Sequence, residues 1–520
     1  MPDGHGITKR KGEHGKMRIY DLKTEYRREP IGLDAANPRF SWKLESDKKN
    51  VVQSSYQILA YADEGGKSVL WDSGVVGSDK SQHVRWEGPE LNSAKRVYWK
   101  VRITADGESA ESEMTYFEMG LLREEDWHAK WIEPEGEIDF QAFQPAPYLR
   151  KTFRVREGLR SARIYQTAHG LYDFWINGKQ GTEEKFKPGF TSYSGRIQYQ
   201  AYDITELLLP GENVWSVILG DGWWRGTIGG MSRNNWGYKL HFLGQIILAY
   251  EDGSREYVCS DESFKAVTGG ILVCDMKAGE TFCAEKEPEG WKKAGFNDHE
   301  WKSVHVAKGQ FCQNELLVPS RSVPVVEKER FSCKTFRDAE GSLILDFGQN
   351  IAGYVKMRLR NCKRGQEVVL VHGEDIKDGA FSVENLFAEM FTEERFQQVR
   401  YVAEGEAEEI YCPTFSVFGF RYVKVAGYEE EIKPGDFVAV AVYSDLEETG
   451  DFSCSNPLVN QLVKNSRWSQ KGNYLDVPTD CPTRERSPWT GDSQVYCRTA
   501  ADFMNVYPFF EKWMQDFNLD

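Results

Sequence analysis

Hydrophobic and polar residues alternate at a period of two along most of this chain, in short runs that turn residues separate. Examples from residues 17–125 are RIYDLKTEY, SYQILAYA and VYWKVRITA. Successive side chains of a β-strand point to opposite faces, so this period predicts strands with one buried face. Short strands at regular spacing favour a β-sandwich of the fibronectin type III or immunoglobulin kind, with Trp42 and Trp99 in its core.

The same period continues to about residue 445. Further runs of this kind are YLRKTFRV and SARIYQTA in residues 126–325, and LILDFGQNIAGYVKMRLR and PTFSVFGFRYVKVAGY in residues 326–445. They predict two more β-rich regions. Residues 1–16 are polar without an apolar run, which indicates a disordered extension rather than a secretory signal. The chain is therefore predicted to be multidomain and mainly β.

The period becomes helical in residues 446–520. Ser455 is the candidate N-cap of a first helix, with Pro457 in its first turn. A second helix is predicted from Thr490 and a third from Pro508. The apolar face of the third helix consists of Phe509, Phe510, Trp513, Met514 and Phe517.

Between the first and second of these helices lies the stretch DVPTDCPTRERSPWTGD, residues 476–492, which we call the acidic stretch. It holds four acidic residues, two arginines, one tryptophan and three prolines. The prolines exclude a continuous helix. Rigid turns and a tryptophan favour a loop that holds carboxylates in fixed positions. The alternative is a solvated acidic loop that its own arginines neutralise.

The pattern D-C-P-x-R-E-R-x-x-W-T-G-D in residues 480–492 resembles the signature of glycoside hydrolase family 78, the bacterial α-L-rhamnosidases. The resemblance implies that Glu485 is the general acid. The residues that it implies as ligands of the rhamnose ring are Asp480, Arg484, Trp489 and Asp492. The chain departs from the family at Ser487-Pro488, where Leu-Gly is more usual, and this departure puts the path of the loop in doubt.

The residue types suit glycosidic cleavage. The reaction passes through an oxocarbenium-like state and needs a carboxylic acid that protonates the leaving oxygen. An inverting enzyme also needs a second carboxylate that activates water. Arginine and aspartate side chains suit paired contacts to vicinal hydroxyls, and a tryptophan offers a flat face to the apolar side of a 6-deoxy sugar.

The resemblance covers the chain after Met17. It implies a fibronectin III-like β-sandwich at 17–125, a lectin-like jelly roll at 126–325, a β-sandwich linker domain at 326–445, and the first helices and acidic loop of an (α/α)6 catalytic barrel at 446–520. In some members the jelly-roll region binds rhamnose with calcium, so calcium at 126–325 stays an alternative. The candidate groove residues, each of which fits a turn or core position better, are Asp173, Asn177, Asp221, Trp223, Trp224 and Asn235.

The predicted barrel is truncated, because the chain reaches only Asp520 and the family's general base is expected beyond residue 520. The face of Phe509, Trp513 and Phe517 is then expected to be exposed. A fragment of a longer enzyme, the product of a split gene and a non-catalytic remnant are the competing explanations. The aromatic face favours the first.

Composition narrows the partners. The net charge of −15 makes nucleic acid and anionic membranes poor partners. No apolar run approaches the roughly 18 residues of a membrane span. The ten cysteines are scattered without a CxxC pair, which favours free thiols and a cytoplasmic location. His372 and Glu374 have the look of a metal pair but lack a third ligand nearby, so no metal is predicted.

The sequence therefore predicts the N-terminal part of a cytoplasmic, inverting α-L-rhamnosidase that removes terminal non-reducing α-L-rhamnose and needs no cofactor. Its partner is a rhamnoside substrate, and a homo-oligomer is left open. The alternatives are a rhamnose-binding fragment that lacks the general base, a β-sandwich scaffold without sugar affinity, and an inverting enzyme for a related sugar.

Overall fold

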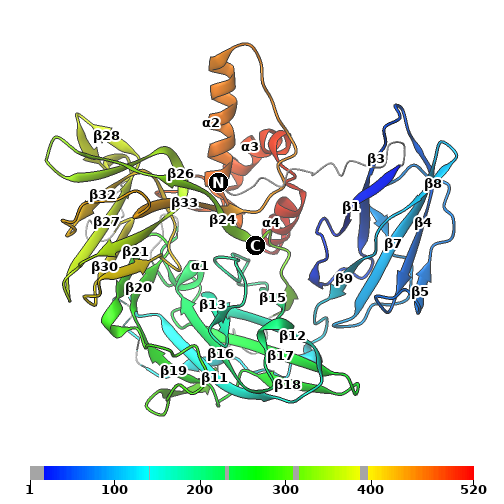
Figure 1. Cartoon of the computed structure of the whole chain (residues 1–520), viewed down its shortest axis with the longest axis horizontal. Coiled ribbons are helices and arrows are strands. Elements are labelled where there is room, and N and C mark those ends of the chain that lie inside the picture. The colour runs from blue at the N-terminus through cyan, green and yellow to red at the C-terminus, as the bar shows by residue number, and fades with distance from the viewer. Residues whose placement is uncertain (1–16, 137, 140, 229–232, 309–315, 387–395) are drawn as a thin grey trace. The chain divides into compact units, whose positions relative to one another are not determined.

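The computed structural model describes residues 17–136, 138–139, 141–228, 233–308, 316–386 and 396–520. They form two compact units, one that ends at Asp126 and one that begins at Trp127. Both units are rich in strands, and the helices gather at the end of the chain (Figure 1). The prediction of a mainly β, multidomain chain is confirmed.

The first unit contains two sheets around one core. The first sheet has the order β1 (Arg18–Thr24), β3 (Arg39–Glu45), β6 (Val84–Arg85). The second has the order β2 (Ile31–Leu33), β9 (Thr115–Met119), β7 (Arg96–Ala105), β4 (Gln53–Tyr61), β5 (Val69–Asp72), with β8 (Glu108–Glu111) paired to β7. Trp42 from one sheet and Trp99 from the other are buried in the shared core, as predicted. A short helix, η1 (Glu124–Asp126), ends the unit.

The second unit begins with a large sheet of the order β14-β13-β16-β11-β19-β22-β10-β17-β12-β15-β23, with β18 paired to β17. Its strands are β10 (Ile132–Pro134), β11 (Pro147–Val155), β12 (Leu159–His169), β13 (Leu171–Ile176), β14 (Lys179–Gln180), β15 (Ile197–Asp203), β16 (Gly211–Gly220), β17 (His241–Tyr250), β18 (Arg255–Cys259), β19 (Lys265–Thr268), β22 (Lys302–Val306) and β23 (Leu317–Pro319). Trp215 of β16 packs against Phe242 of β17 and Phe264 at ring-centroid distances of 5.5 and 5.3 Å. Strands far apart in the sheet order therefore share one core.

The next sheet has the order β20-β21-β30-β27-β32-β26-β33-β24, and β25 and β31 also pair with β26. Its strands are β20 (Ile271–Asp275), β21 (Gly279–Cys283), β24 (Val325–Ser332), β25 (Lys334–Arg337), β26 (Leu343–Arg360), β27 (Glu367–Gly373), β30 (Gln398–Val402), β31 (Glu408–Tyr411), β32 (Phe418–Ala426) and β33 (Phe437–Ser444). The hairpin β20–β21 precedes residue 325 but joins this sheet through parallel pairing of β21 with β30. Residues of both the second and the third predicted regions therefore build this sheet.

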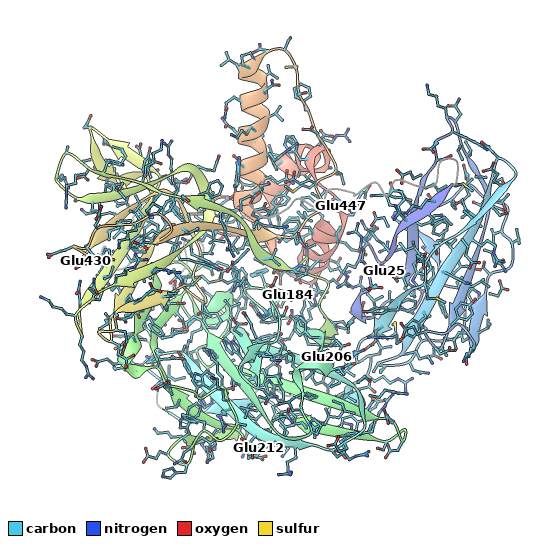
Figure 2. All side chains as sticks on the ribbon, in the orientation of Figure 1. Glu25, Glu184, Glu206, Glu212, Glu430 and Glu447 are labelled. Carbon is cyan, nitrogen blue, oxygen red and sulfur yellow. The ribbon has the colours of Figure 1, made fainter. Side chains whose placement is uncertain are left out.

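Smaller elements complete the β-rich part. They are η2 (Thr205–Leu207), η3 (Ala284–Lys286), η5 (Glu384–Leu386), α1 (Gly222–Arg225) and the two-stranded sheet of β28 (Asp375–Lys377) and β29 (Ala380–Ser382). Glutamate side chains of this part lie both at the surface and inside (Figure 2). Glu212 and Glu430 are exposed, whereas the partly buried Glu184 accepts a hydrogen bond from the Tyr202 hydroxyl at 2.6 Å. A carboxylate that leaves water needs such a donor.

Three helices follow: α2 (Pro457–Asn473), α3 (Thr490–Phe503) and α4 (Tyr507–Leu519). The small hairpin of β34 (Tyr474–Leu475) and β35 (Val477–Pro478) follows α2, and the acidic stretch begins within this hairpin. The prediction of Ser455 as N-cap is wrong, because the Asn456 side chain accepts the Leu458 amide hydrogen at 3.0 Å. None of the helices in the described part of the chain is long and apolar enough to cross a bilayer.

The predicted exposure of the aromatic face of α4 is wrong for most of that face. Phe509 and Trp513 are buried, and only Phe517 is half-exposed. Phe509 stacks on Tyr474 with ring centroids 4.5 Å apart, and Trp513 belongs to the core of the large sheet. The reason is that Phe509 packs in a small core with Tyr474 and residues of α3, whereas Trp513 packs against the large sheet. The exposed apolar side chains of α2 and α3 are instead Leu458, Val459, Leu462 and Val495.

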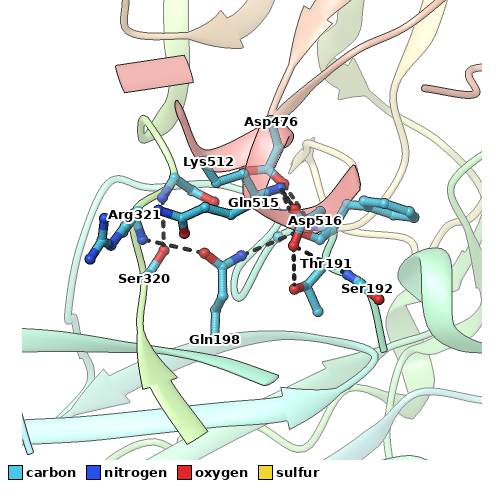
Figure 3. A network of polar contacts seen from close by, with 12 residues as sticks. Thr191, Ser192, Gln198, Ser320, Arg321, Asp476, Lys512, Gln515 and Asp516 are labelled. Carbon is cyan, nitrogen blue, oxygen red and sulfur yellow. Dashed lines mark hydrogen bonds and ion pairs between the residues drawn. The ribbon is translucent and has the colours of Figure 1, made fainter. Parts of the chain in front are cut away.

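A buried network of charges holds α4 on the large sheet (Figure 3). The Lys512 ammonium group lies 3.1 Å from a carboxylate oxygen of Asp476 and 3.2 Å from one of Asp516. It also donates to the Phe190 carbonyl oxygen at 2.5 Å. Arg196 reaches Asp516 at 2.7 Å. Two cations therefore face two carboxylates in the interior.

The side chains around Asp516 complete this network. Its Oδ1 accepts hydrogen bonds from the Thr191 hydroxyl at 2.9 Å and from the Ser192 amide at 3.3 Å. The Phe190 amide donates to Asp476 Oδ2 at 2.6 Å. Buried charges are tolerated only when they are paired and hydrogen-bonded, so each member of this network depends on the others.

We predict that Lys512→Met destabilises the protein by about 3–5 kcal/mol, because it leaves two carboxylates buried with one cation. The thermal midpoint should fall by roughly 5–15 °C, measured by circular dichroism. Lys464→Met is the matched control, since Lys464 is exposed on α2, and it should leave the midpoint within about 2 °C. Equal midpoints for the two variants would contradict the role of Lys512.

Candidate active site

The acidic stretch begins in the hairpin of β34 and β35. Asp476 lies at its tip with a φ of 65° and is buried. Its amide hydrogen binds the Ser444 hydroxyl at 2.9 Å, and its carboxylate holds the Phe190 amide and Lys512. Aspartate is among the few residues that adopt a left-handed conformation readily. The sequence therefore allows a tight turn here, and the polar contacts fix it.

The loop from Thr479 to Trp489 folds back on itself. The Asp480 amide donates to the Ser487 carbonyl oxygen at 3.2 Å, and the Ser487 amide donates to Asp480 Oδ1 at 3.1 Å. The Glu485 amide contacts the Cys481 sulfur at 3.3 Å. The Ser487-Pro488 pair, where the chain departs from the family pattern, thus lies in a closed loop that Asp480 stabilises.

Glu485 and Trp489 lie side by side in this loop. The indole Nε1 of Trp489 donates to Glu485 Oε2 at 2.6 Å. Glu485 is partly buried, and Trp489 is 50% exposed. The loop thus places a partly buried carboxyl group beside an aromatic side chain that is open to solvent.

The other predicted ligands lie on the open side of the loop. Arg484 and Asp492 are exposed, and Asp492 is in the first turn of α3. Among the described residues, neither of them makes a hydrogen bond or an ion pair. The structure therefore brings Glu485 and Trp489 together in a loop that Asp480 stabilises. The side chains of Arg484 and Asp492 remain available to a ligand.

Arg486 points the opposite way and is buried. Its guanidinium donates to the carbonyl oxygens of Met276 at 2.5 Å and Val417, and to the Gln397 side-chain oxygen at 2.9 Å. None of these partners is indicated by the sequence. No spacing signal could have identified these partners, because they come from segments far from Arg486 in the chain.

Lys277, in the turn between β20 and β21, is a further residue that the sequence did not single out. It is buried, and burial together with the nearby Arg486 charge lowers its pKa to about 7. The negative charge of Asp275 acts in the opposite direction. A lysine amine that titrates near neutral pH therefore lies within electrostatic reach of the predicted acid.

His372 and Glu374, which resemble a metal-binding pair in the sequence, have different partners in the structure. His372 is fully buried, stacks on Phe418 at 4.3 Å and contacts the Gln397 carbonyl oxygen through Nδ1 at 2.9 Å. Burial lowers its pKa to about 3, so it is neutral. Glu374 is hydrogen-bonded to Asn350 at 2.8 Å. Over the described ranges, no group of three or more metal-ligating side chains comes together.

The groove candidates of the second predicted region mostly serve the fold. Asp173 is ion-paired with Lys187 at 2.9 Å, and Asp221 is fully buried against Arg225. Asn177 has a φ of 54° and caps a turn through the Val214 amide. Trp223 and Trp224 are buried, and Asn235 is partly exposed. Calcium or sugar binding in this region stays an untested alternative.

Four family models match the chain in order. They are a Rha78A-like N-terminal immunoglobulin domain at 19–123, an alpha-L-rhamnosidase N-terminal domain at 157–329, a bacterial alpha-L-rhamnosidase concanavalin-like domain at 336–443, and a bacterial alpha-L-rhamnosidase 6 hairpin glycosidase domain at 447–519. The first agrees with the β-sandwich of the first unit, and the last contains the acidic stretch.

Relatives agree over nearly the whole chain. An alpha-L-rhamnosidase of Formosa agariphila is 33% identical over 94% of this chain and 53% of its own length. The structure of an alpha-L-rhamnosidase from Aspergillus terreus is 32% identical with a TM-score of 0.90, over 96% of this chain and 57% of that one. The alpha-L-rhamnosidase of Streptomyces avermitilis, solved with L-rhamnose, is 26% identical with a TM-score of 0.89, over 96% and 64%.

This chain spans about half the length of the curated α-L-rhamnosidases of Formosa agariphila and an Alteromonas species that it resembles in sequence. The acidic stretch that carries the predicted acid lies in the last of the four matched domains. The order of the domains, the relatives and the geometry of the loop agree, and the chain belongs to the bacterial α-L-rhamnosidases of glycoside hydrolase family 78.

Proposed function

We propose that this chain is the N-terminal part of an α-L-rhamnosidase that hydrolyses terminal non-reducing α-L-rhamnosyl residues with inversion. The observation that carries the proposal is the Glu485 carboxyl group, half out of water and hydrogen-bonded to the exposed Trp489 indole. The names of the relatives and the rhamnose bound to the Streptomyces avermitilis enzyme support the substrate class.

Glu485 acts as the general acid in this proposal. It donates its proton to the leaving oxygen as the glycosidic bond breaks, and charge develops on the sugar ring. The indole N–H of Trp489 fixes one oxygen of Glu485, which leaves the other oxygen for the leaving group. The ring of Trp489 offers its face to the apolar side of the sugar, and Arg484, Asp492 and Asp480 offer polar groups to the hydroxyls.

We also propose that α2, α3 and α4 are the first helices of a six-hairpin barrel and that the general base comes from sequence beyond residue 520. The match of residues 447–519 to the hairpin glycosidase domain supports this. The exposed side chains of Leu458, Leu462 and Val495 support it as well, because soluble helices rarely leave such residues in water.

We predict that Glu485→Gln abolishes catalysis but not sugar binding, since the amide cannot donate a proton in the transition state. The kcat for an alkyl α-L-rhamnoside should fall by about 10²–10⁴-fold, and less for the p-nitrophenyl rhamnoside, whose leaving group needs little protonation. Release of rhamnose by a version that carries the downstream barrel is the measurement. Glu430→Gln, at an exposed glutamate, is the control and should keep the wild-type rate.

The same assay on the 520-residue chain separates the alternatives. Turnover that Glu485→Gln removes would mean that the base is supplied by another group. Rhamnose binding in calorimetry without turnover would mean a sugar-recognising part of the enzyme. If the longer version kept its rate on the alkyl rhamnoside after Glu485→Gln, the acid role of Glu485 would be lost.

We predict that Trp489→Ala weakens rhamnose binding by roughly 2–10-fold, because it removes the aromatic face beside Glu485. Trp489→Phe keeps a ring and removes only the donor to Glu485. It should therefore retain binding and lower kcat. Calorimetry measures the first effect and the rate on an alkyl rhamnoside the second. Identical binding by the alanine variant and the wild type would rule out stacking on Trp489.

A further inference from the structure

Arg486 is a buried cation without a carboxylate partner among the residues that the structure describes. Its guanidinium bonds four oxygens: the carbonyls of Thr483 at 3.1 Å, Met276 at 2.5 Å and Val417, and Oε1 of Gln397 at 2.9 Å. Its charge also lies over the Phe418 ring at 5.9 Å. Burial lowers the pKa of Arg486 to about 10. Its hydrogen-bond partners are all neutral, and the nearby Asp275 charge acts against the effect of burial on this pKa.

Burying the Arg486 guanidinium among neutral acceptors costs free energy, so a structural role is expected to accompany it. Taking a guanidinium out of water costs several kcal/mol, and neutral acceptors return less of that cost than a carboxylate does. A loop that only had to cover the surface would keep this arginine in solvent, as it keeps Arg484. The fork geometry of the guanidinium instead fixes several oxygens at once. Precise placement of the loop is what the contacts of Arg486 supply.

The acceptors outside the loop come from three separate segments. Met276 lies in the turn between β20 and β21, Gln397 lies directly before β30, and Val417 lies directly before β32. These strands belong to one sheet. Arg486 therefore bonds to the ends of three strands that the sheet already holds in register.

Gln397 is itself locked. Its side-chain nitrogen donates to the carbonyl oxygens of His372 and Gly419, both at 3.1 Å, and its Oε1 accepts the Gly419 amide at 3.2 Å. Its own amide donates to the Lys277 carbonyl oxygen at 3.2 Å. The Gln397 oxygen that accepts from Arg486 is therefore held in place. The hydrogen bond between them fixes the position of Arg486 as well as adding stability.

The backbone at Arg486 connects these contacts to the acid. Arg486 has a φ of 56°, a left-handed conformation that is strained for a residue with a long side chain. The turn sends Arg486 into the sheet ends while Glu485, one residue earlier, stays partly exposed beside Trp489. Strain of this kind persists only where the surroundings fix it, and here the bonds of Arg486 do so.

We infer that Arg486 is the positioning residue of the loop from Thr479 to Trp489. Its four hydrogen bonds fix Glu485 relative to the strand ends of β20–β21, β30 and β32. The inference rests on the proposed function, because it assigns Arg486 to the acid of that reaction. It adds that the β-rich part of the chain takes part in the geometry of catalysis without touching the sugar.

The first test needs no turnover. Amide hydrogen exchange of the peptide over residues 479–489 is compared between the wild type and Arg486→Gln. Loss of the charged hydrogen bonds should raise exchange in this loop by about 10-fold or more, while the sheet strands keep their protection. The matched control is Arg498→Gln, which removes the same charge at an exposed position on α3 and should leave the loop unchanged.

Two results would overturn the inference at this stage. Unchanged exchange in the loop of Arg486→Gln would show that other contacts hold it. A uniform rise over the whole second unit would show that Arg486 serves the fold and not the loop. If Arg486→Gln does not fold, Arg486→Lys decides by the same criterion, because lysine keeps the charge but cannot bond all four oxygens.

The second test reads catalysis in a version that carries the downstream barrel. Arg486→Gln should lower kcat on an alkyl rhamnoside by about 10-fold or more with KM within about twofold, because Arg486 does not touch the sugar. Arg486→Lys should recover part of the rate. A loosened loop with an unchanged kcat would overturn the inference. A wild type without turnover would count against the proposed function alone. Amide hydrogen exchange over residues 479–489 would then still show whether Arg486 holds the loop that carries Glu485.

Discussion

The burial of cations beneath the acidic stretch is the constraint on which the rest of the helical part depends. Lys512 binds Asp476, the first residue of the acidic stretch. Arg486, in the second half of the stretch, bonds to residues at the ends of sheet strands. Between these two anchors, Val477 packs in the core of the large sheet and Thr483 is buried, while Asp480 and Ser487 bond to each other. Because each cation has left water, it cannot shift without losing its partners. The path of the loop is therefore fixed at both sides by desolvated charge.

The two anchors differ in physical kind. Lys512 faces carboxylates, so its attraction is strong but tolerant of direction, and it ties α4 to the large sheet. The hydrogen-bond acceptors of Arg486 are neutral oxygens, which bind a cation well in one orientation only. The first contact stabilises the packing of a helix. The second defines the direction of a short loop, which is the finer requirement of a site.

The features that depend on neighbouring residues in the chain could be predicted from the sequence. The period of two gave the strands and the buried Trp42 and Trp99, and prolines marked the loop. It could not give what depends on distant partners: the inward path of Arg486, the low pKa of Lys277 and the burial of Phe509 and Trp513. The N-cap failed for a smaller reason, because Ser455 and Asn456 are both good caps and only backbone geometry chooses Asn456.

The acidic stretch divides its side chains between the two tasks of a site. Arg486 and Asp476 point inward and are held, while Arg484, Trp489 and Asp492 stay in solvent. A loop fixed by folding offers its free groups in place before a ligand arrives, so the free energy of binding need not be spent on ordering them. The cost of burying Arg486 is met by the stability of the β-rich part.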